Sequence, residues 1–366
     1  MKFNEDGVRE IPFVLDTSAI SKIRLMLDDC TKTIPDYPQN FFSGKGIVIC
    51  AGGISYLTCA WILINRLKEV KCKLPVELWF RSGELSQLSI QTFKSLGIEC
   101  RMFDSQSIEN LDGVGLKPLA IKLSKFKEIL YLDADNFCLK DPSYLFDYEK
   151  YKEFGAVFWP DYWRTAKDNP IWQIVDNYQY NDFEQESGQI MINKEICWKE
   201  LNLTIYMNKE KRIFYQLLLG DKDTFKFSWN FLKSKFQMIG FDAGSCGFIC
   251  SKEGFIGKTM TQHDPNGNLL FLHRNLGKWN VNDSSQIIWK FLLNFQDSSL
   301  DRKYFLCEND KHGKHMKFGG NFKTKLLPKG FLTIEPACLA NLAVLASMPF
   351  FQEELRSAKV RLSPKT

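Results

Sequence analysis

Glu128-Ile129-Leu130-Tyr131-Leu132-Asp133-Ala134-Asp135-Asn136 is the stretch that decides the fold of this chain. Ile129 to Leu132 contains only apolar and aromatic residues, which predicts a central strand covered on both faces. The Asp141-Pro142 step that follows marks the end of regular structure. Ligands of open α/β sheets bind at the carboxyl ends of such strands, so Asp133 and Asp135 are expected at the mouth of a site.

Two carboxylates one residue apart suit a hard divalent cation. Mn²⁺ or Mg²⁺ takes oxygen ligands and is usually held by one or two carboxylates together with substrate phosphates. A diphosphate leaving group fits this chemistry, because the cation stabilises its developing negative charge. The alternative is a strand end followed by a turn rich in Asp and Asn, since so short a motif often matches by chance.

Composition excludes several classes of protein. The chain has 366 residues, 45% of them apolar, which is ample for a globular core and excludes a disordered or fibrous protein. The 48 basic and 43 acidic residues leave a net charge of +5, spread along the chain. This balance gives no case for nucleic acid, although it suits a nucleotide-diphosphate ligand.

Cysteine usage and hydropathy bear on the compartment. The eleven cysteines have no ligand-like spacing, and an odd number without a framework favours free thiols in a reducing compartment. Residues 1–10 are too charged for the apolar part of a signal peptide. Leu339 to Phe351 is the longest weakly polar stretch, and it is short for a bilayer span and interrupted by Pro349. The sequence therefore predicts a cytoplasmic protein without a transmembrane segment.

Strands and helices alternate in the first half of the chain. Strands are expected at 46–50, 76–80 and 99–103, and helices at 55–70 and 85–96, which predicts βαβ units with a parallel sheet. Gly52 and Gly53 follow the first strand and would let a nucleotide approach the backbone, although glycines at such a turn are more often just turn residues. Lys117 opens a further helix near the ligand edge of the sheet, with a solvated surface lysine as the alternative.

The second half is less regular and holds the remaining candidates. Aromatic residues such as Trp159 could stack on sugar rings, or could belong to the core. Two polar clusters, 184–189 and 220–224, could contact hydroxyl-rich ligands or cap helices. His273 ends an apolar strand and is followed by Gly277-Lys278, which suggests a third metal ligand with a diphosphate clamp; a hydrogen-bonded structural histidine is the alternative. The chain beyond 286 carries little signal and is expected to be helical and basic.

Several blocks occur in a common order over about residues 45–280 and together resemble the fungal α-mannosyltransferase family, glycosyltransferase family 71. The matching blocks are Leu116-Lys117-Pro118-Leu119-Ala120, Ile129 to Asn136, Gly155 to Asp161, Glu186-Ser187-Gly188-Gln189, Gly220 to Phe225, and the block that begins at His273. Several blocks in register are far more specific than a lone Asp-x-Asp motif.

The resemblance implies a metal-dependent GT-A fold, an α/β nucleotide-diphospho-sugar transferase with a mostly parallel central sheet flanked by helices. It implies GDP-mannose as donor, a mannose-containing oligosaccharide, glycoprotein or glycolipid as acceptor, Mn²⁺ or Mg²⁺ as cofactor, and retention of anomeric configuration. Fungal members of the family are typically type II Golgi membrane proteins, so the resemblance implies a Golgi-lumenal location if this chain is a truncated form of such a protein. The implied metal ligands are Asp133, Asp135 and His273. The donor would also contact Gly52, Gly53, Lys117 and Lys278; Trp159, Asp221 and Asp223 would contact sugars; and Glu186, Gln189 and Asp161 are the candidates for catalysis.

Three regions are expected. Residues 1–43 form an N-terminal helical extension, 44–285 a GT-A catalytic domain with a nucleotide-binding half at about 44–140 and an acceptor-binding half at about 141–285, and 286–366 a C-terminal helical and basic extension. Two alternatives to a mannosyltransferase remain: a retaining transferase that uses another nucleotide sugar such as a UDP-hexose, and an inactive GT-A domain that serves as a glycan-binding subunit.

Overall fold

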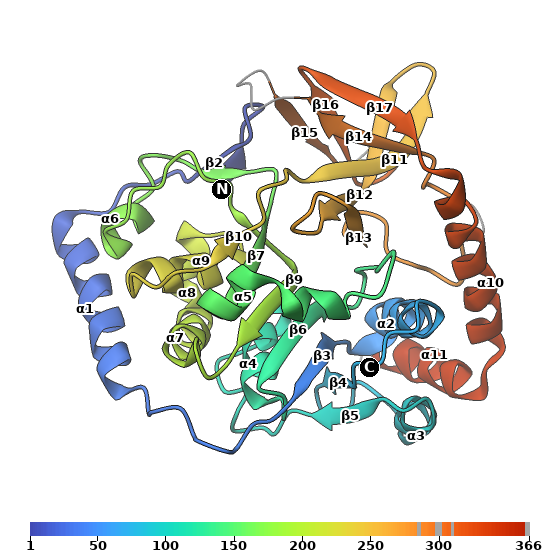
Figure 1. The fold of residues 1–366 in the computed structure, drawn as a ribbon, viewed down its shortest axis with the longest axis horizontal. Coiled ribbons are helices and arrows are strands. Elements are labelled where there is room, and N and C mark those ends of the chain that lie inside the picture. The colour runs from blue at the N-terminus through green and yellow to red at the C-terminus, as the bar shows by residue number, and fades with distance from the viewer. Residues whose placement is uncertain (284–286, 297–301, 309–310, 363–366) are drawn as a thin grey trace.

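A seven-stranded sheet forms the centre of the molecule in a computed structural model that describes residues 1–283, 287–296, 302–308 and 311–362 (Figure 1). Its strands in spatial order are β10 (Gln237–Met238), β7 (Ala156–Pro160), β9 (Gln185–Asn193), β6 (Glu128–Asp133), β3 (Lys45–Cys50), β4 (Val76–Phe80) and β5 (Glu99–Met102). Only β9 runs antiparallel to its neighbours β6 and β7. The predicted α/β class with a mostly parallel sheet is confirmed.

Helices cover both faces of this sheet. The helices of the main domain are α2 (Gly53–Glu69), α3 (Gln87–Ser95), α4 (Leu116–Leu123), α5 (Glu149–Phe154), α6 (Ile171–Val175), α7 (Trp198–Lys209), α8 (Lys211–Leu217) and α9 (Lys222–Phe231), with short 3₁₀ turns η1 (Gly113–Gly115) and η2 (Ser143–Asp147). Strand β6 explains the layering, because its buried side chains alternate. Leu130 and Leu132 pack in the cluster that contains α2, whereas Ile129 and Tyr131 pack with α4, α7 and α9.

A second sheet of seven strands stands beside the first. Its strands are β11 (Gly244–Cys250), β12 (Gly254–His263), β13 (Leu269–His273), β14 (Phe291–Phe295), β15 (Lys303–Cys307), β16 (His315–Gly319) and β17 (Phe322–Leu326). Strand β13 also lies along the segment after β6: the amide of Leu272 donates to Phe137 O, and that of Leu139 to Leu270 O. This long-range pairing carries the end of β13 to the end of β6.

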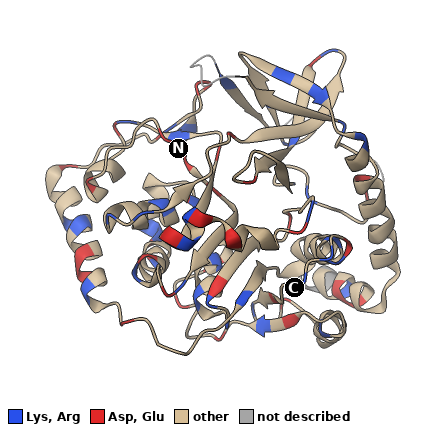
Figure 2. Cartoon of the chain, viewed as in Figure 1, with Lys and Arg blue, Asp and Glu red and all other residues tan. Residues whose placement is uncertain are grey.

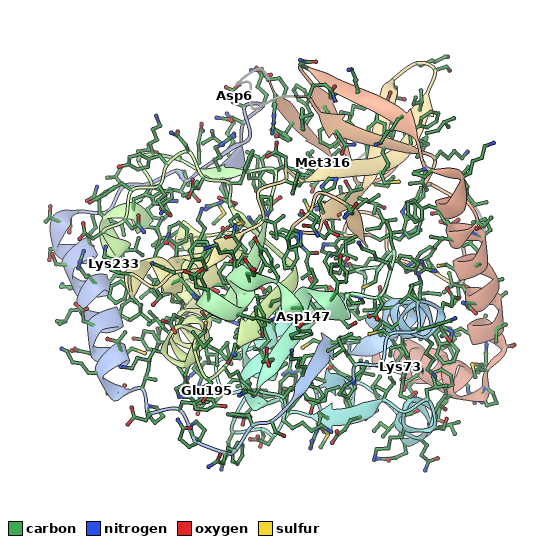
Figure 3. The ribbon with its side chains drawn as sticks, in the orientation of Figure 1. Asp6, Lys73, Asp147, Glu195, Lys233 and Met316 are labelled. Atoms are coloured by element: carbon green, nitrogen blue, oxygen red, sulfur yellow. The ribbon has the colours of Figure 1, made fainter. Side chains whose placement is uncertain are left out.

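The two ends of the chain pack on this body (Figure 1). At the N-terminus, β1 (Lys2–Phe3) and β2 (Val8–Glu10) join β8 (Arg164–Thr165), and α1 (Thr17–Thr33) packs against α6 and α7. At the C-terminus, η3 (Lys329–Phe331), α10 (Ile334–Ser347) and α11 (Pro349–Leu362) cover α2 and α3. Side chains fill the space between these helices and the sheet (Figure 3).

The expectation of a helical C-terminal extension is wrong for Phe291–Phe295, Lys303–Cys307, His315–Gly319 and Phe322–Leu326, which are the strands β14 to β17. Their burial follows no common alternation: β14 buries Leu292 and Leu293 in succession, whereas β17 is largely exposed. Strands β14 and β16 pair with the distant β11 and β12, and β17 and β15 pair with them in turn. The helical expectation holds for α10 and α11. The boundaries of the three expected regions stay a prediction.

The distribution of charged residues and the state of the cysteines agree with the expectations from the sequence. Basic and acidic residues are interspersed over the ribbon rather than gathered in one region (Figure 2). All eleven cysteines are free thiols, as their number and spacing predicted.

Candidate active site

Asp133 and Asp135 lie at the carboxyl edge of the central sheet, where the sequence predicted them. Asp133 is the last residue of β6, and a turn closed by Asn136 N donating to Asp133 O (2.9 Å) carries Asp135 just beyond it. The side chain of Asp133 is 26% exposed and that of Asp135 only 3%. One carboxylate is therefore open to a ligand while the other is enclosed by protein.

His273 joins the two aspartates from the second sheet. Its Nε2 atom lies 3.2 Å from Asp135 Oδ1 and 3.9 Å from Asp133 Oδ2. One possible ligand atom from each of the three residues falls within 4.8 Å of the others. Two carboxylates and an imidazole on one side leave the other side for water and phosphate oxygens, which is the donor set that Mn²⁺ or Mg²⁺ accepts. The three residues fit the cation that the resemblance implies.

Glu186 fixes the orientation of the His273 ring. Glu186 Oε1 lies 2.9 Å from His273 Nδ1 and also accepts from the amide of Gly188 (2.7 Å). Burial opposes protonation of the imidazole, but the carboxylates of Asp135 and Glu186 outweigh it and raise the pKa of His273 to about 10. A carboxylate on Nδ1 turns Nε2 toward the aspartates, which is how ligating histidines are usually held.

Gly188 makes room for this contact. A Cβ atom at this position would lie 2.5 Å from His273 Nδ1 and 2.8 Å from Glu186 Oε1. Because real Cβ atoms do not approach so closely, only glycine permits β9 to pass beside the imidazole.

Two lysines balance the carboxylates. Lys278, on the loop after β13, forms an ion pair with Asp135 and is about one third exposed. Lys117 in α4 is buried between Asp133 (3.2 Å) and Asp221 (3.1 Å). Burial alone would lower the pKa of Lys117, but these two carboxylates outweigh it and raise it, so the ammonium stays charged. Lys117 is thus buried beside Asp133 rather than a solvated surface lysine.

Asp161 belongs to a second network of charges behind Glu186. Lys222 Nζ contacts Asp161 (2.9 Å), Glu184 (2.5 Å) and Asp223 (3.0 Å), and Arg9 from the N-terminal β2 contacts Glu184 at 2.6 Å. Burial raises the pKa of Asp161 to about 7; Lys222 opposes this rise and Glu186 adds to it. A carboxyl group with such a pKa can gain or lose a proton near neutral pH.

A cavity of about 340 Å³ opens beside Lys278. It is lined by the first turns of α2, the loop after Lys278 and the C-terminal helix α11, with Ser55, Thr58, Asn280 and Asn282 as its polar residues. Gly52 caps α2 and Gly53 begins it, and a Cβ on Gly52 would lie 1.9 Å from Glu84 Oε2. Helix α2 has 17 residues and no side-chain N-cap, and its first turns line the cavity. The backbone amides at its start and the helix dipole favour an anion there.

The structure brings most predicted site residues together but not all. Asp133, Asp135, His273, Lys278, Lys117, Glu186 and Asp221 lie in one connected cluster of contacts. Gln189 lies one layer behind, where its Oε1 accepts from Asn136 Nδ2 (2.7 Å) and its side chain has no exposure.

The assignment of Trp159 and Asp223 to sugar binding is not supported, because both side chains are fully buried. The indole of Trp159 donates to His263 O (2.8 Å) and packs edge-on against Phe271, so it is a core residue. Asp223 accepts from the amide of Gln185 (2.9 Å) and pairs with Lys222, inside the second network. Aromatic and acidic residue types alone could not distinguish these positions from surface ones.

Sequence reasoning missed several partners of the site. Tyr131 donates its hydroxyl to Asp133 Oδ1 (2.9 Å), and Ser187 accepts from Lys117 at both its carbonyl (2.9 Å) and its hydroxyl (2.8 Å). Tyr131 and Ser187 lie within the sequence blocks that carry the family resemblance, and this position was the one feature of the sequence that could have identified them. The role of Lys222 depends on tertiary contacts that no spacing reveals.

A second group of possible metal ligands, Cys250, Glu253 and His312, lies on the second sheet. This group offers one carboxylate, Glu253, together with a thiol and an imidazole, whereas the first group offers two carboxylates, the ligands that a hard cation prefers. We therefore assign the candidate metal centre to the first group.

One helical stretch in the described part of the chain, Lys329–Ser347, is long and apolar enough to cross a membrane, with 19 residues and a mean hydropathy of 1.4. The expectation that the apolar segment here is too short was wrong, because the helical stretch begins before Leu339. It packs on α2 and buries Cys338, Leu342 and Leu345, as helices of soluble proteins also do.

Comparison with known proteins connects this site to a family. A family model of mannosyltransferases, Mannosyl_trans3, matches residues 44–184 and 177–264. The match includes Asp133, Asp135 and Glu186 and ends before His273.

The similar curated proteins are also mannosyltransferases by name. The chain is 28% identical over 299 residues to alpha-1,2-mannosyltransferase MNN21 of Candida albicans, covering 65% of this chain and 45% of the relative. It is 25% identical over 280 residues to alpha-1,2-mannosyltransferase MNN2 of Saccharomyces cerevisiae, covering 62% of this chain and 46% of the relative. The chain spans about half the length of the curated relatives it matches.

Among solved structures, the galactosyltransferase LgtC with donor and acceptor sugar analogues aligns with a TM-score of 0.38 and 9% identity, over 52% of this chain and 72% of that chain. The glycosyltransferase GlyE of Streptococcus pneumoniae aligns with a TM-score of 0.38 and 15% identity, over 54% of this chain and 46% of that chain. The sequence match over more than half of its residues shows that the chain belongs to the Mannosyl_trans3 family of mannosyltransferases.

Proposed function

We propose that this protein is a metal-dependent, retaining α-mannosyltransferase that moves mannose from GDP-mannose to a mannose-containing glycan. The observation that carries the proposal is the convergence of Asp133, Asp135 and His273 at the edge of the sheet, with Lys278 beside them, in a chain of a mannosyltransferase family. The names of the relatives favour an α-1,2 linkage.

The donor diphosphate would lie between the metal centre and the start of α2. Asp133, Asp135 and His273 would hold Mn²⁺ or Mg²⁺, which when bound offsets the negative charge that develops on the leaving diphosphate. Lys278 would move from Asp135 to a phosphate oxygen, since it is partly exposed and borders the cavity. The backbone amides after Gly52 and Gly53 would receive the same phosphates.

Other residues near the metal centre would bind the sugars. Lys117 pairs with both Asp133 and Asp221, and this closeness to Asp133 supports a role in which Asp221 would accept a hydrogen bond from a sugar hydroxyl. Glu186 would act mainly by orienting His273. Asp161, with its pKa near neutrality, remains the candidate for contact with the reacting sugar. Gln189 is as fully buried as Trp159 and Asp223, so it would act through Asn136 rather than touch the sugar.

Two alternatives have different chemistry. A UDP-hexose donor would use the same metal centre and differ only in base and hexose contacts. An inactive glycan-binding subunit would have no need for a metal ligand set held by Glu186 and backed by lysines, and the presence of that set argues against it.

The compartment and acceptor belong to the proposal as well. Nothing in the family match supports the cytoplasmic expectation, and a Golgi-lumenal setting agrees better with glycan extension. The acceptor would be the mannose-containing part of an oligosaccharide, glycoprotein or glycolipid.

Product analysis tests this function. The protein is incubated with GDP-mannose, Mn²⁺ and an α-mannobiose acceptor, and the product linkage is read by NMR. We expect an α-linked trimannoside whose formation stops with EDTA. A β linkage would contradict retention, and turnover of UDP-hexoses in place of GDP-mannose would favour the first alternative.

A further inference from the structure

Arg274, the residue directly after His273, is buried, and its guanidinium group contacts a backbone carbonyl, a carboxylate and an indole ring. Its relative exposure is 1%. Its Nε donates to Gly277 O (2.6 Å), its Nη1 contacts Glu335 Oε1 (2.8 Å), and its guanidinium lies 3.6 Å from the ring centroid of Trp279. The side chain therefore crosses the loop that it begins.

The backbone of Arg274 connects the same loop to the metal centre. Its amide donates to Asp135 O (2.9 Å), and its carbonyl accepts from the amide of Gly277 (3.2 Å). His273 lies on one side of Arg274, and Lys278 follows Gly277 on the other. His273 and Lys278, which both contact the Asp135 carboxylate, are thus held by the loop that one buried arginine crosses.

Glu335, near the start of α10, holds this arginine in place. One carboxylate oxygen receives Arg274, and the other accepts from the amides of Ile288 and Trp289, each at 2.8 Å. Its relative exposure is 2%. A buried carboxylate whose two oxygens are both occupied fixes its partner strongly, because each lost contact leaves a buried polar group unpaired.

We propose that Arg274 and Glu335 are positioning residues of the metal centre, and that α10 is a structural part of the active site. The proposal rests on the function argued above. Both residues lie beyond residue 264, where the family match ends, so nothing in that match assigns them a role. Helix α10 then helps to fix the distance of His273 and Lys278 from Asp135.

Glu335→Gln tests the proposal on the full chain. The amide cannot accept at both ends, so it either presents an N–H group to Arg274 or loses the amides of Ile288 and Trp289. We expect Mn²⁺ binding, measured by EPR without donor, to weaken by about tenfold or more, as for other residues that orient metal ligands. The donor KM should rise in parallel, and Glu335→Asp should recover part of both.

Glu354→Gln is the matched control. Glu354 lies on α11, is 3% exposed, and accepts from Ser86 N (2.5 Å), at the N-cap of α3, and from Ser89 Oγ (2.6 Å), in the first turn of α3. Its loss also loosens a C-terminal helix but does not touch the loop after β13. We expect Glu354→Gln to lower the melting temperature and leave Mn²⁺ affinity unchanged.

The outcomes separate this inference from the proposed function. If Glu335→Gln binds Mn²⁺ like the wild type while Asp135→Asn does not, the positioning role is wrong and the function stands. If Asp135→Asn also binds Mn²⁺ unchanged, the proposed function is wrong. Should Glu335→Gln fail to fold, Arg274→Lys decides the question, because lysine keeps the charge but cannot reach Gly277 O and Glu335 together; unchanged Mn²⁺ affinity there overturns the inference.

Discussion

His273 Nδ1 lies 2.9 Å from Glu186 Oε1, while the Nε2 atom of the same ring faces the carboxylates of Asp133 and Asp135. The ring therefore joins β9 of the central sheet to the aspartates after β6. Glu186, which the sequence made a candidate for catalysis, instead contacts the imidazole of a proposed metal ligand. This relationship leads to the first prediction.

Glu186→Gln should weaken Mn²⁺ binding by about ten- to a hundredfold while the protein stays folded, because an amide orients the imidazole less firmly and lowers its basicity. Isothermal titration with Mn²⁺, compared with the melting temperature, checks this. Full turnover with normal Mn²⁺ affinity would remove Glu186 from the site.

Gly188→Ala should impair metal binding by steric overlap with His273, without any change of charge. The new methyl group would lie 2.5 Å from His273 Nδ1, so the ring or β9 must shift. Gly240→Ala is the control, since no heavy atom lies within 4 Å of a Cβ placed there. We expect Gly188→Ala to lose Mn²⁺ affinity and Gly240→Ala to keep it; equal behaviour of the two variants would mean that the close approach has no role.

Mn²⁺ binding should depend on pH through His273. Its pKa is raised to about 10 in the metal-free protein, so the ring carries a proton at neutral pH and must lose it to bind a cation. The apparent affinity should therefore rise with pH, by about tenfold per unit between pH 6 and pH 8, with release of one proton. Calorimetry in buffers of different ionisation enthalpy measures the proton directly. An affinity that is constant with pH would contradict ligation by His273.

Lys117→Met should destabilise the fold as well as the site, because it leaves Asp133 and Asp221 facing each other without a cation. Breaking a buried ion pair in this way costs about 3–5 kcal/mol of unfolding free energy. The double variant Lys117→Met/Asp221→Asn should regain part of this loss. Urea unfolding of the wild type, both single variants and the double variant gives the coupling, and simple additivity would show that the two residues do not interact.

The sequence could predict the parts of the site that local pattern determines. The apolar run Ile129–Leu132 located the strand that ends at Asp133, and the apolar run before His273 located β13. It could not predict that β13 pairs with residues after Asp135, because that contact joins segments more than 130 residues apart in sequence. The sequence also could not assign Trp159 to the core or to a sugar-binding surface, since an aromatic side chain suits both equally well. The strands between 291 and 326 depend on partners in β11 and β12, so their own short patterns gave no clear period.

Metal-dependent turnover of nucleotide sugars tests the central claim most directly. Hydrolysis of GDP-mannose, UDP-glucose and UDP-galactose is measured with Mn²⁺ and with EDTA, for the wild type, Asp133→Asn, Asp135→Asn and the control Asp141→Asn. We predict that the wild type and Asp141→Asn cleave GDP-mannose only with Mn²⁺, and that each site variant loses about a hundredfold or more of this activity, since a bound cation contributes several kcal/mol to such a step. Cleavage that persists in EDTA, or that Asp133→Asn and Asp135→Asn retain at saturating Mn²⁺, would contradict the metal centre.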